Sequence, residues 1–174
     1  MQLDAEHLIT VLAEKIGALP PETAIVGIHS GGVWVAERLR PLLVLNHVKL
    51  PEHAYGTLAV TLHRDDFSAI GLHPQKKSTD INFTVEGRDI LLVDDVINSG
   101  RTIRAALNEL FDFGRPASVR LACLVDRGGR ALPFSPDYVA LTMNLPADEE
   151  LALAEDAATG KLRFDIYSKP HAKS

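Results

Sequence analysis

The spacing of hydrophobic residues divides the chain into alternating helices and strands. Helical spacing predicts helices over residues 3–16, 33–44, 99–113 and 148–158. In the first helix, Asp4 is the expected N-cap and Gly17 the expected end. Short apolar runs rich in β-branched residues predict strands over 24–28, 55–62, 89–94 and 117–125, with weaker candidates at 138–141 and 162–166.

The order of these elements predicts an α/β fold with a mainly parallel sheet flanked by helices. Strands that are separated by helices pair in parallel through right-handed crossovers, and their ligands bind beyond the carboxyl ends of the strands. Three segments contain residues suited to binding a ligand. They begin at His29, Asp94 and Asp126, and each lies at the end of a predicted strand. Residues 64–86 are polar and show little periodicity, so we expect a functional loop, a lid or a disordered stretch there.

Composition narrows the class of protein. The 174 residues suit a single domain over 1–174, and 46% hydrophobic with 24% charged residues is ordinary for a globular protein. No apolar run reaches the length of a membrane span, and the acidic N-terminal segment lacks the features of a signal peptide, so we expect a cytoplasmic protein without a membrane partner. Cys123 is the only cysteine and is expected to be a buried, inert thiol, and the histidines show no zinc-binding spacing.

Residues 91–103 combine a buried strand, two adjacent carboxylates and a helix start. Asp94 and Asp95 follow the strand, and Ser99, Gly100 and Thr102 come at the mouth of the next helix. The N–H groups of a helix N-terminus hold phosphate, and glycine lets the backbone approach it closely. Carboxylates accept hydrogen bonds from sugar hydroxyls, directly or through Mg²⁺. Taken alone, the two carboxylates are more simply a turn at the strand end, and Ser99 is more simply a helix cap. Both features in this order predict a site for a ribose 5-phosphate.

This segment resembles the motif by which type I phosphoribosyltransferases bind phosphoribosyl pyrophosphate (PRPP). More narrowly, the chain resembles the PyrR family of pyrimidine-operon regulators with uracil phosphoribosyltransferase activity, and the likeness covers roughly residues 1–142. The matching stretches are residues 62–68, 79–83, 91–107, 112–117 and 124–133. The tail over 144–174 has no counterpart that we could match and is expected to be divergent.

The resemblance implies the type I phosphoribosyltransferase fold with a flexible loop over 64–86 and a small hood. It assigns the binding of PRPP to Asp94, Asp95, Val96, Ile97, Asn98, Ser99, Gly100, Arg101 and Thr102, with catalytic roles for Asp94, Asp95 and Arg64. It assigns pyrophosphate binding to His29, Ser30, Gly31, Gly32 and Arg64. This turn lacks the basic residues expected to flank a threonine there. A Gly-Gly turn before a helix fits an anion nest, but Gly-Gly more often just makes a tight turn. Arg64 could equally be a solvated charge paired with Asp65 or Asp66.

The implied substrates are PRPP and uracil, with UMP and UTP-type nucleotides as further ligands and Mg²⁺ as cofactor. Base binding is expected from Asp126, Arg127 and Gly128, although Asp126 and Arg127 could instead form a salt bridge at the strand end. No metal site made by the protein alone is expected, because Mg²⁺ would arrive with PRPP and contact Asp94 and Asp95. Purine-using relatives often carry an acid where this chain has Asn98, which favours a pyrimidine.

Three other functions are compatible with the same residues. The first is a regulator that binds leader RNA through Arg104, Arg115 and Arg120, which the net charge of −5 argues against. The second is a phosphoribosyltransferase for a purine or for orotate, and the third is a PRPP sensor without turnover. The resemblance also implies a homodimer or a homotetramer.

Overall fold

The computed structural model describes residues 3–60 and 77–170. Its helices are α1 (Ala5–Ile16), α2 (Gly31–Leu45) and α3 (Arg101–Phe111). Its strands are β1 (Ala24–Ile28), β2 (Tyr55–Leu58), β3 (Asp80–Ile81), β4 (Asp89–Ile97), β5 (Ser118–Asp126), β6 (Tyr138–Thr142), β7 (Glu149–Glu155) and β8 (Leu162–Ser168).

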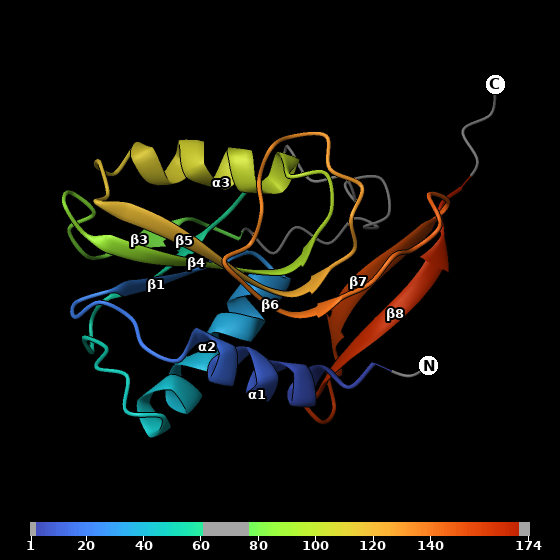
Figure 1. The fold of residues 1–174 in the computed structure, drawn as a ribbon, viewed down its shortest axis with the longest axis horizontal. Helices are drawn as coiled ribbons and strands as arrows, with labels where there is room; N and C mark the ends of the chain where they lie inside the picture. The colour runs from blue at the N-terminus through green and yellow to red at the C-terminus, as the bar shows by residue number, and fades with distance from the viewer. Residues whose placement is uncertain (1–2, 61–76, 171–174) are drawn as a thin grey trace.

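Six strands form one mainly parallel sheet in the order β3-β2-β1-β4-β5-β6. Only the short β3 runs antiparallel to its neighbour β2. Strands β7 and β8 form a separate antiparallel pair at one end of the sheet (Figure 1). The mainly parallel α/β fold expected from the order of elements is therefore confirmed.

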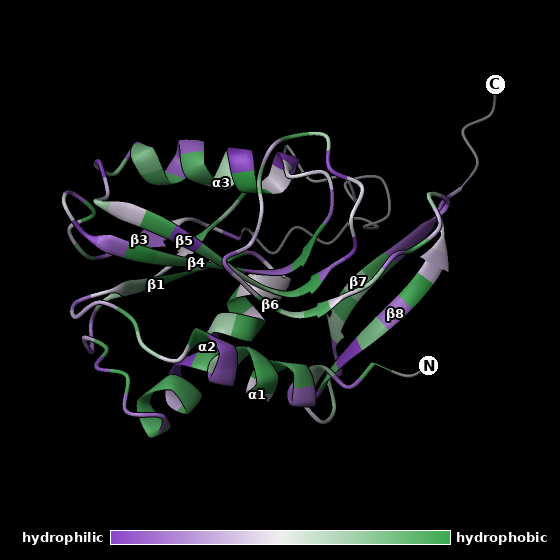
Figure 2. Cartoon of the chain, viewed as in Figure 1, coloured by the Kyte–Doolittle hydropathy of each residue, from purple (hydrophilic) through white to green (hydrophobic). Residues whose placement is uncertain are grey.

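Helices cover both faces of the sheet. Figure 1 shows α3 above the sheet and α1 and α2 below it. One hydrophobic cluster lies between the sheet and α1 and α2, and includes Leu12, Leu39 and Leu91. The other lies under α3 and includes Leu92, Ile103 and Leu110. The central strands are buried on both faces, which explains their nearly continuous hydrophobic sequence (Figure 2).

The ends of α1 follow the sequence pattern. The Asp4 carboxylate accepts a hydrogen bond from the His7 N–H at 3.0 Å, and Gly17 is the C-cap with a positive φ of 58°. At the same end of the helix, the Lys15 ammonium donates to the Val139 carbonyl at 2.7 Å on the edge strand β6. The cap and the contact of Lys15 fix α1 along the edge of the sheet.

The helix predicted over 148–158 is wrong. Leucine, alanine and glutamate favour helices, but this segment forms β7 and a turn instead. Leu151 pairs with Ile166 and Leu153 with Phe164, and both leucines are buried. Tertiary pairing outweighs the local helix preference here, and the alternation of hydrophobic and polar residues along β8 is visible in Figure 2.

Several boundaries also differ from the prediction. Strand β4 continues three residues beyond Asp94, so the two carboxylates lie within the strand and not at its end. Helix α2 begins at Gly31, so the predicted turn over 29–32 includes the first residues of that helix. Part of the predicted loop forms β3, and residues 61–76 lie outside the described part of the chain.

Cys123 lies on β5 beside Asp94 of β4 and is completely buried. Burial raises the pKa of this thiol well above its ordinary value, and the nearby carboxylates of Asp94 and Asp95 raise it further. The thiol therefore stays protonated, as expected for an inert core cysteine.

Candidate functional site

The turn after β1 packs directly against β4. A Cβ on Gly32 would overlap the carbonyl oxygen of Val93, and a Cβ on Gly31 would overlap the carboxylate of Asp95. Only glycine allows this approach, because any side chain would push the turn away from the strand. The absence of side chains at Gly31 and Gly32 thus brings the N-terminus of α2 against the acidic pair.

Asp94 and Asp95 are almost completely buried, with 1% and 7% of their surface exposed. The Asp95 N–H donates to the Asp94 carboxylate at 3.0 Å, and the Val96 N–H donates to the Asp95 carboxylate at 2.9 Å. Consecutive residues of a strand point to opposite faces, but at this end of β4 both residues reach the wall of the same cavity. The Asp95 carboxylate lies against the turn after β1.

The segment Asn98–Gly100 leads from β4 into α3. Gly100 is the N-cap with a positive φ of 92°, and the Arg101 N–H donates to the Ser99 hydroxyl at 3.2 Å. The Ser99 carbonyl accepts from the Ala131 and Leu132 N–H groups at 2.9 and 3.0 Å, which ties this loop to the segment after β5. The start of α3 thereby presents backbone N–H groups in a fixed position.

Asp126 at the end of β5 pairs with Arg130 and not with Arg127. The Arg130 guanidinium donates to both carboxylate oxygens at 2.9 and 2.7 Å, and also to the carbonyls of Asn98 and Phe134. Partial burial by itself would raise the pKa of Asp126. The hydrogen bonds from Arg130 and from the Gly128 N–H outweigh it, so the pKa lies below the ordinary value of 3.8. Asp126 and Arg130 therefore act together to hold the loop at Asn98.

Arg127 reaches from the end of β5 to the β7–β8 pair. Its guanidinium donates to the Glu149 carbonyl at 2.9 Å, while its Nε has no hydrogen-bond partner among the described residues. Only 9% of Arg127 is exposed. A buried guanidinium nitrogen without a partner is costly, so a ligand that accepts a hydrogen bond here would remove a penalty.

These segments surround one cavity of about 530 Å³. Its wall includes predicted site residues from three places in the chain, namely Ser30, Gly31, Asp94, Asp95, Val96, Ile97, Asn98, Ser99, Gly100, Thr102 and Arg127. The predicted residues His29, Gly32, Arg101, Asp126 and Gly128 are not part of this wall. Arg64 lies outside the described residues.

The sequence prediction missed a second group of residues on the wall. They are Trp34, Lys77, Glu150, Leu151, Ala152, Leu153 and Tyr167, whereas Ile103 is the last residue of the predicted segment 91–103. The four residues of β7 were missed because residues 148–158 were predicted to form a helix. The signal for them in the sequence was the alternation of residue types along the segments that form β7 and β8. Lys77 donates a hydrogen bond to the Ser30 hydroxyl, so it brings a positive charge to a turn that has none of its own.

The comparisons with known proteins agree with this geometry. The family model of the phosphoribosyl transferase domain matches residues 3–150. The Bifunctional protein PyrR of Ralstonia nicotianae is 47% identical over 174 residues, which cover 97% of this chain and 96% of that protein. The protein of the same name from Pseudomonas paraeruginosa is 53% identical over 132 residues, which cover 76% of this chain and 74% of that protein.

The chain belongs to the PyrR family. Its phosphoribosyl transferase domain confirms the resemblance inferred from residues 91–103, and it is a pentosyltransferase of the PyrR type. The match to the Ralstonia PyrR extends beyond residue 150, where the family model ends.

Solved structures confirm the fold of this PyrR-family chain. A mutant hypoxanthine phosphoribosyltransferase from Trypanosoma cruzi, in a ternary substrates complex, superposes with a TM-score of 0.61. It is 20% identical and covers 91% of this chain and 89% of its own chain. At this identity the similarity concerns the fold alone.

The described part of the chain offers neither a metal cluster nor a membrane span. Among residues 3–60 and 77–170, no group of three or more His, Cys, Asp or Glu side chains is arranged to hold a metal ion. Within the same residues, no helix is both long and apolar enough to cross a membrane.

The Arg130→Met variant tests the support of the Asn98 loop. At pH 7 we expect a loss of roughly 2 kcal/mol in the free energy of unfolding, because several partly buried hydrogen bonds disappear. The stabilisation from Asp126 is complete above pH 3.8 and is lost as the pH falls through the lowered pKa of the folded state, so the difference between the proteins should shrink in acid. Urea unfolding at neutral and acidic pH measures it, with exposed Arg104→Met as the control. A difference that grows in acid would contradict this account.

Proposed function

We propose that the protein transfers the 5-phosphoribosyl group of PRPP to uracil, giving UMP and pyrophosphate. The observation that carries the proposal is the buried pair Asp94 and Asp95 on the wall of the same cavity as the start of α3. Membership of the PyrR family supports it. Asn98 in place of an acid favours a pyrimidine, whose acidic nitrogen needs no strong base.

The ribose 5-phosphate would bind between β4 and α3. The N–H groups at the start of α3 and the hydroxyls of Ser99 and Thr102 would donate to the 5-phosphate. The carboxylates of Asp94 and Asp95 would accept hydrogen bonds from the ribose hydroxyls. Arg101 lies off the cavity wall and would contribute only long-range positive charge.

The pyrophosphate would bind at the turn over 29–32. Backbone N–H groups at the start of α2 suit an anion, and Lys77 would add the positive charge that the turn lacks. Arg64 is proposed as a further cation for the same group. Negative charge grows on pyrophosphate as it leaves, so cations in this place stabilise the transition state.

Asp94 and Asp95 also fit a Mg²⁺ ion that arrives with PRPP. Two carboxylates are hard oxygen donors, and the remaining positions would be filled by substrate oxygens and water. The ion, when bound, would neutralise charge on the pyrophosphate. The ion would thus be shared between these carboxylates and the substrate.

The base would lie between Arg127 and β7. Arg127 has an unpartnered Nε on the cavity wall, and a carbonyl oxygen of a pyrimidine would accept its hydrogen bond. Leu151 and Leu153 would provide apolar contact on the other side. Of the three residues proposed for the base, Asp126 and Gly128 would act through the conformation of the loop.

The reaction exchanges one bond at C1′ for another. The bond from C1′ to the pyrophosphate oxygen breaks, with positive charge on the ribose ring, and a bond forms from C1′ to N1 of uracil. The N1 proton leaves to solvent. Positioning of the two substrates and stabilisation of the leaving group would account for the rate.

A panel of bases tests the proposed substrate. With PRPP and Mg²⁺, uracil should give nucleotide and pyrophosphate, whereas hypoxanthine, guanine and orotate should react at least about a hundredfold more slowly, because a site built for one set of hydrogen bonds rejects others. Product formation is followed by chromatography. Faster turnover of a purine or of orotate would show that this base, and not uracil, is the substrate. Tight PRPP binding without any product would indicate a sensor.

The double variant Asp94→Asn, Asp95→Asn tests the ribose site. Loss of both charges should lower kcat/KM for PRPP by roughly a thousandfold or more, since charge-assisted hydrogen bonds and ligation of Mg²⁺ disappear together. Asparagine keeps the size of each side chain and one acceptor oxygen, so we expect the fold to persist, which thermal unfolding checks. Asp112→Asn, an exposed site beyond α3, is the matched control, and unchanged activity of the double variant would reject the ribose site.

The Lys77→Met variant tests the charge at the pyrophosphate turn. We expect kcat to fall by about tenfold to a hundredfold, because a cation beside the leaving group acts mainly in the transition state. The reverse reaction should require a higher concentration of pyrophosphate. Steady-state kinetics in both directions measure this, with the exposed Lys49→Met as control. Equal kinetics of the Lys77 variant and the native protein would exclude the role.

RNA binding is a second candidate activity, favoured by the bifunctional naming of the relatives and by exposed arginines at Arg101, Arg104 and Arg115. Arg120 on β5 is partly buried and contributes less.

A further inference from the structure

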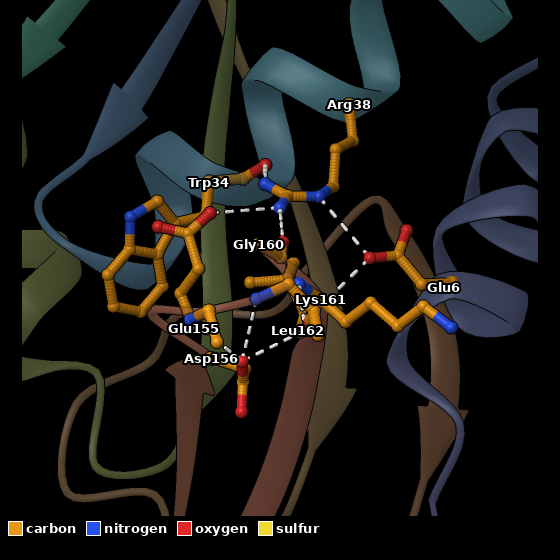
Figure 3. Close-up of polar contacts among 10 residues, drawn as sticks. Glu6, Trp34, Arg38, Glu155, Asp156, Gly160, Lys161 and Leu162 are labelled. Carbon is orange, nitrogen blue, oxygen red and sulfur yellow. Dashed lines mark hydrogen bonds and ion pairs between the residues drawn. The ribbon is translucent and has the colours of Figure 1, made fainter.

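Arg38 of α2 joins three parts of the molecule through one side chain (Figure 3). Its guanidinium donates to the Glu155 carboxylate at 2.9 Å and to the Gly160 carbonyl at 2.5 Å, on either side of the turn between β7 and β8. Its Nε lies 3.4 Å from a Glu6 carboxylate oxygen on α1. The same Glu6 oxygen accepts a hydrogen bond from the Leu162 N–H at 3.3 Å. The turn of the β7–β8 hairpin is thus fixed to both helices.

The rest of the hairpin lies outside the six-stranded sheet. Among the described residues, strands β7 and β8 pair only with each other, and a lone two-stranded hairpin is marginally stable. Leu151, Leu153 and Leu162 pack on the hydrophobic cluster of α1 and α2, which supplies stability but no fixed position. At the opposite end of β7, Arg127 holds the Glu149 carbonyl. The part of β7 that faces the cavity therefore lies between two arginine contacts.

Helix α2 connects the Arg38 contacts to the proposed pyrophosphate turn. The helix begins at Gly31, on the cavity wall, and Arg38 follows about two turns later. The Trp34 carbonyl accepts from Arg38 at 3.1 Å, and Trp34 itself lines the cavity. One helix thus supplies Gly31 and Trp34 to the cavity wall and, further along, Arg38 to the turn of the hairpin.

We propose that Arg38 is a positioning residue. It sets the distance between β7 and the residues of α2 that line the cavity, and so determines the affinity for the base. The inference rests on the proposed function, because it takes the space beside β7 as the site of the base. A guanidinium suits this role, since its planar set of donors reaches Glu155, Gly160 and Glu6 in one fixed geometry. PRPP would be little affected, because its ribose 5-phosphate is held by β4 and α3.

Substitution of Arg38 should change the KM for uracil and leave the KM for PRPP nearly unchanged. In Arg38→Met we expect KM for uracil to rise by roughly tenfold, because a misplaced wall weakens binding, whereas KM for PRPP stays within about twofold. Arg38→Lys should give a smaller rise, since an ammonium cannot serve all the acceptors. The control is Arg163→Met, which removes an exposed arginine whose ion pairs, to Asp156 and Asp165, stay within the hairpin.

A milder variant keeps the proposal testable if Arg38→Met does not fold. Glu155→Gln removes one charge but leaves an acceptor, so KM for uracil should rise by about twofold to threefold. The double variant with Arg38→Met should be no worse than Arg38→Met alone, because both changes act on the same contact. Independent, multiplying effects would overturn the proposed coupling.

Fluorescence of Trp34, the only tryptophan, gives a readout that needs no turnover. Release of the hairpin should expose the indole, so acrylamide should quench Arg38→Met more strongly than the native protein and Arg163→Met. If the native protein makes no UMP, the proposed function fails and the quenching alone decides whether Arg38 holds the hairpin. If it makes UMP, equal KM values for uracil in Arg38→Met and the native protein, or a parallel rise for both substrates, overturn the inference.

Discussion

The close approach of the Gly31–Gly32 backbone to β4 is the constraint on which the site depends. It brings the start of α2 against the Asp95 carboxylate, so that the turn proposed to bind pyrophosphate and the acidic pair face the same cavity. Neither group tolerates much displacement, because a single Cβ at either glycine would separate them. The charges of the two groups are opposite in character, which suits a substrate with both phosphates and sugar hydroxyls.

The second constraint is the burial of Asp94 and Asp95. Backbone N–H groups of Asp95 and Val96 donate to the two carboxylates and hold them in place on the cavity wall. A ligand that carries hydroxyl groups, or that brings a cation, matches these acceptors, so their fixed position would contribute to selectivity.

The polar contacts around the cavity have separate tasks. Arg130 fixes the Asn98 loop through a hydrogen bond to the Asn98 carbonyl, and Arg127 reaches across to Glu149. Arg38 holds the far end of the hairpin, outside the cavity. Three arginines of one chain thus meet carbonyl and carboxylate acceptors on different elements, and their planar donors fix geometry that hydrophobic packing leaves adjustable.

The α/β class could be predicted from the sequence alone. So could the segment over 91–103 as a candidate site, because its strand, carboxylates and helix start are contiguous. The sequence also indicated the turn over 29–32 and Arg127, although their meeting with Asp94 and Asp95 required the parallel pairing of β1, β4 and β5. The strand over 149–155 became evident only from the fold, since pairing with β8 overcomes the local helix preference there. The same holds for Lys77 beside Ser30 and for Arg38 beside Glu155, because contacts between distant residues leave no pattern in a single sequence.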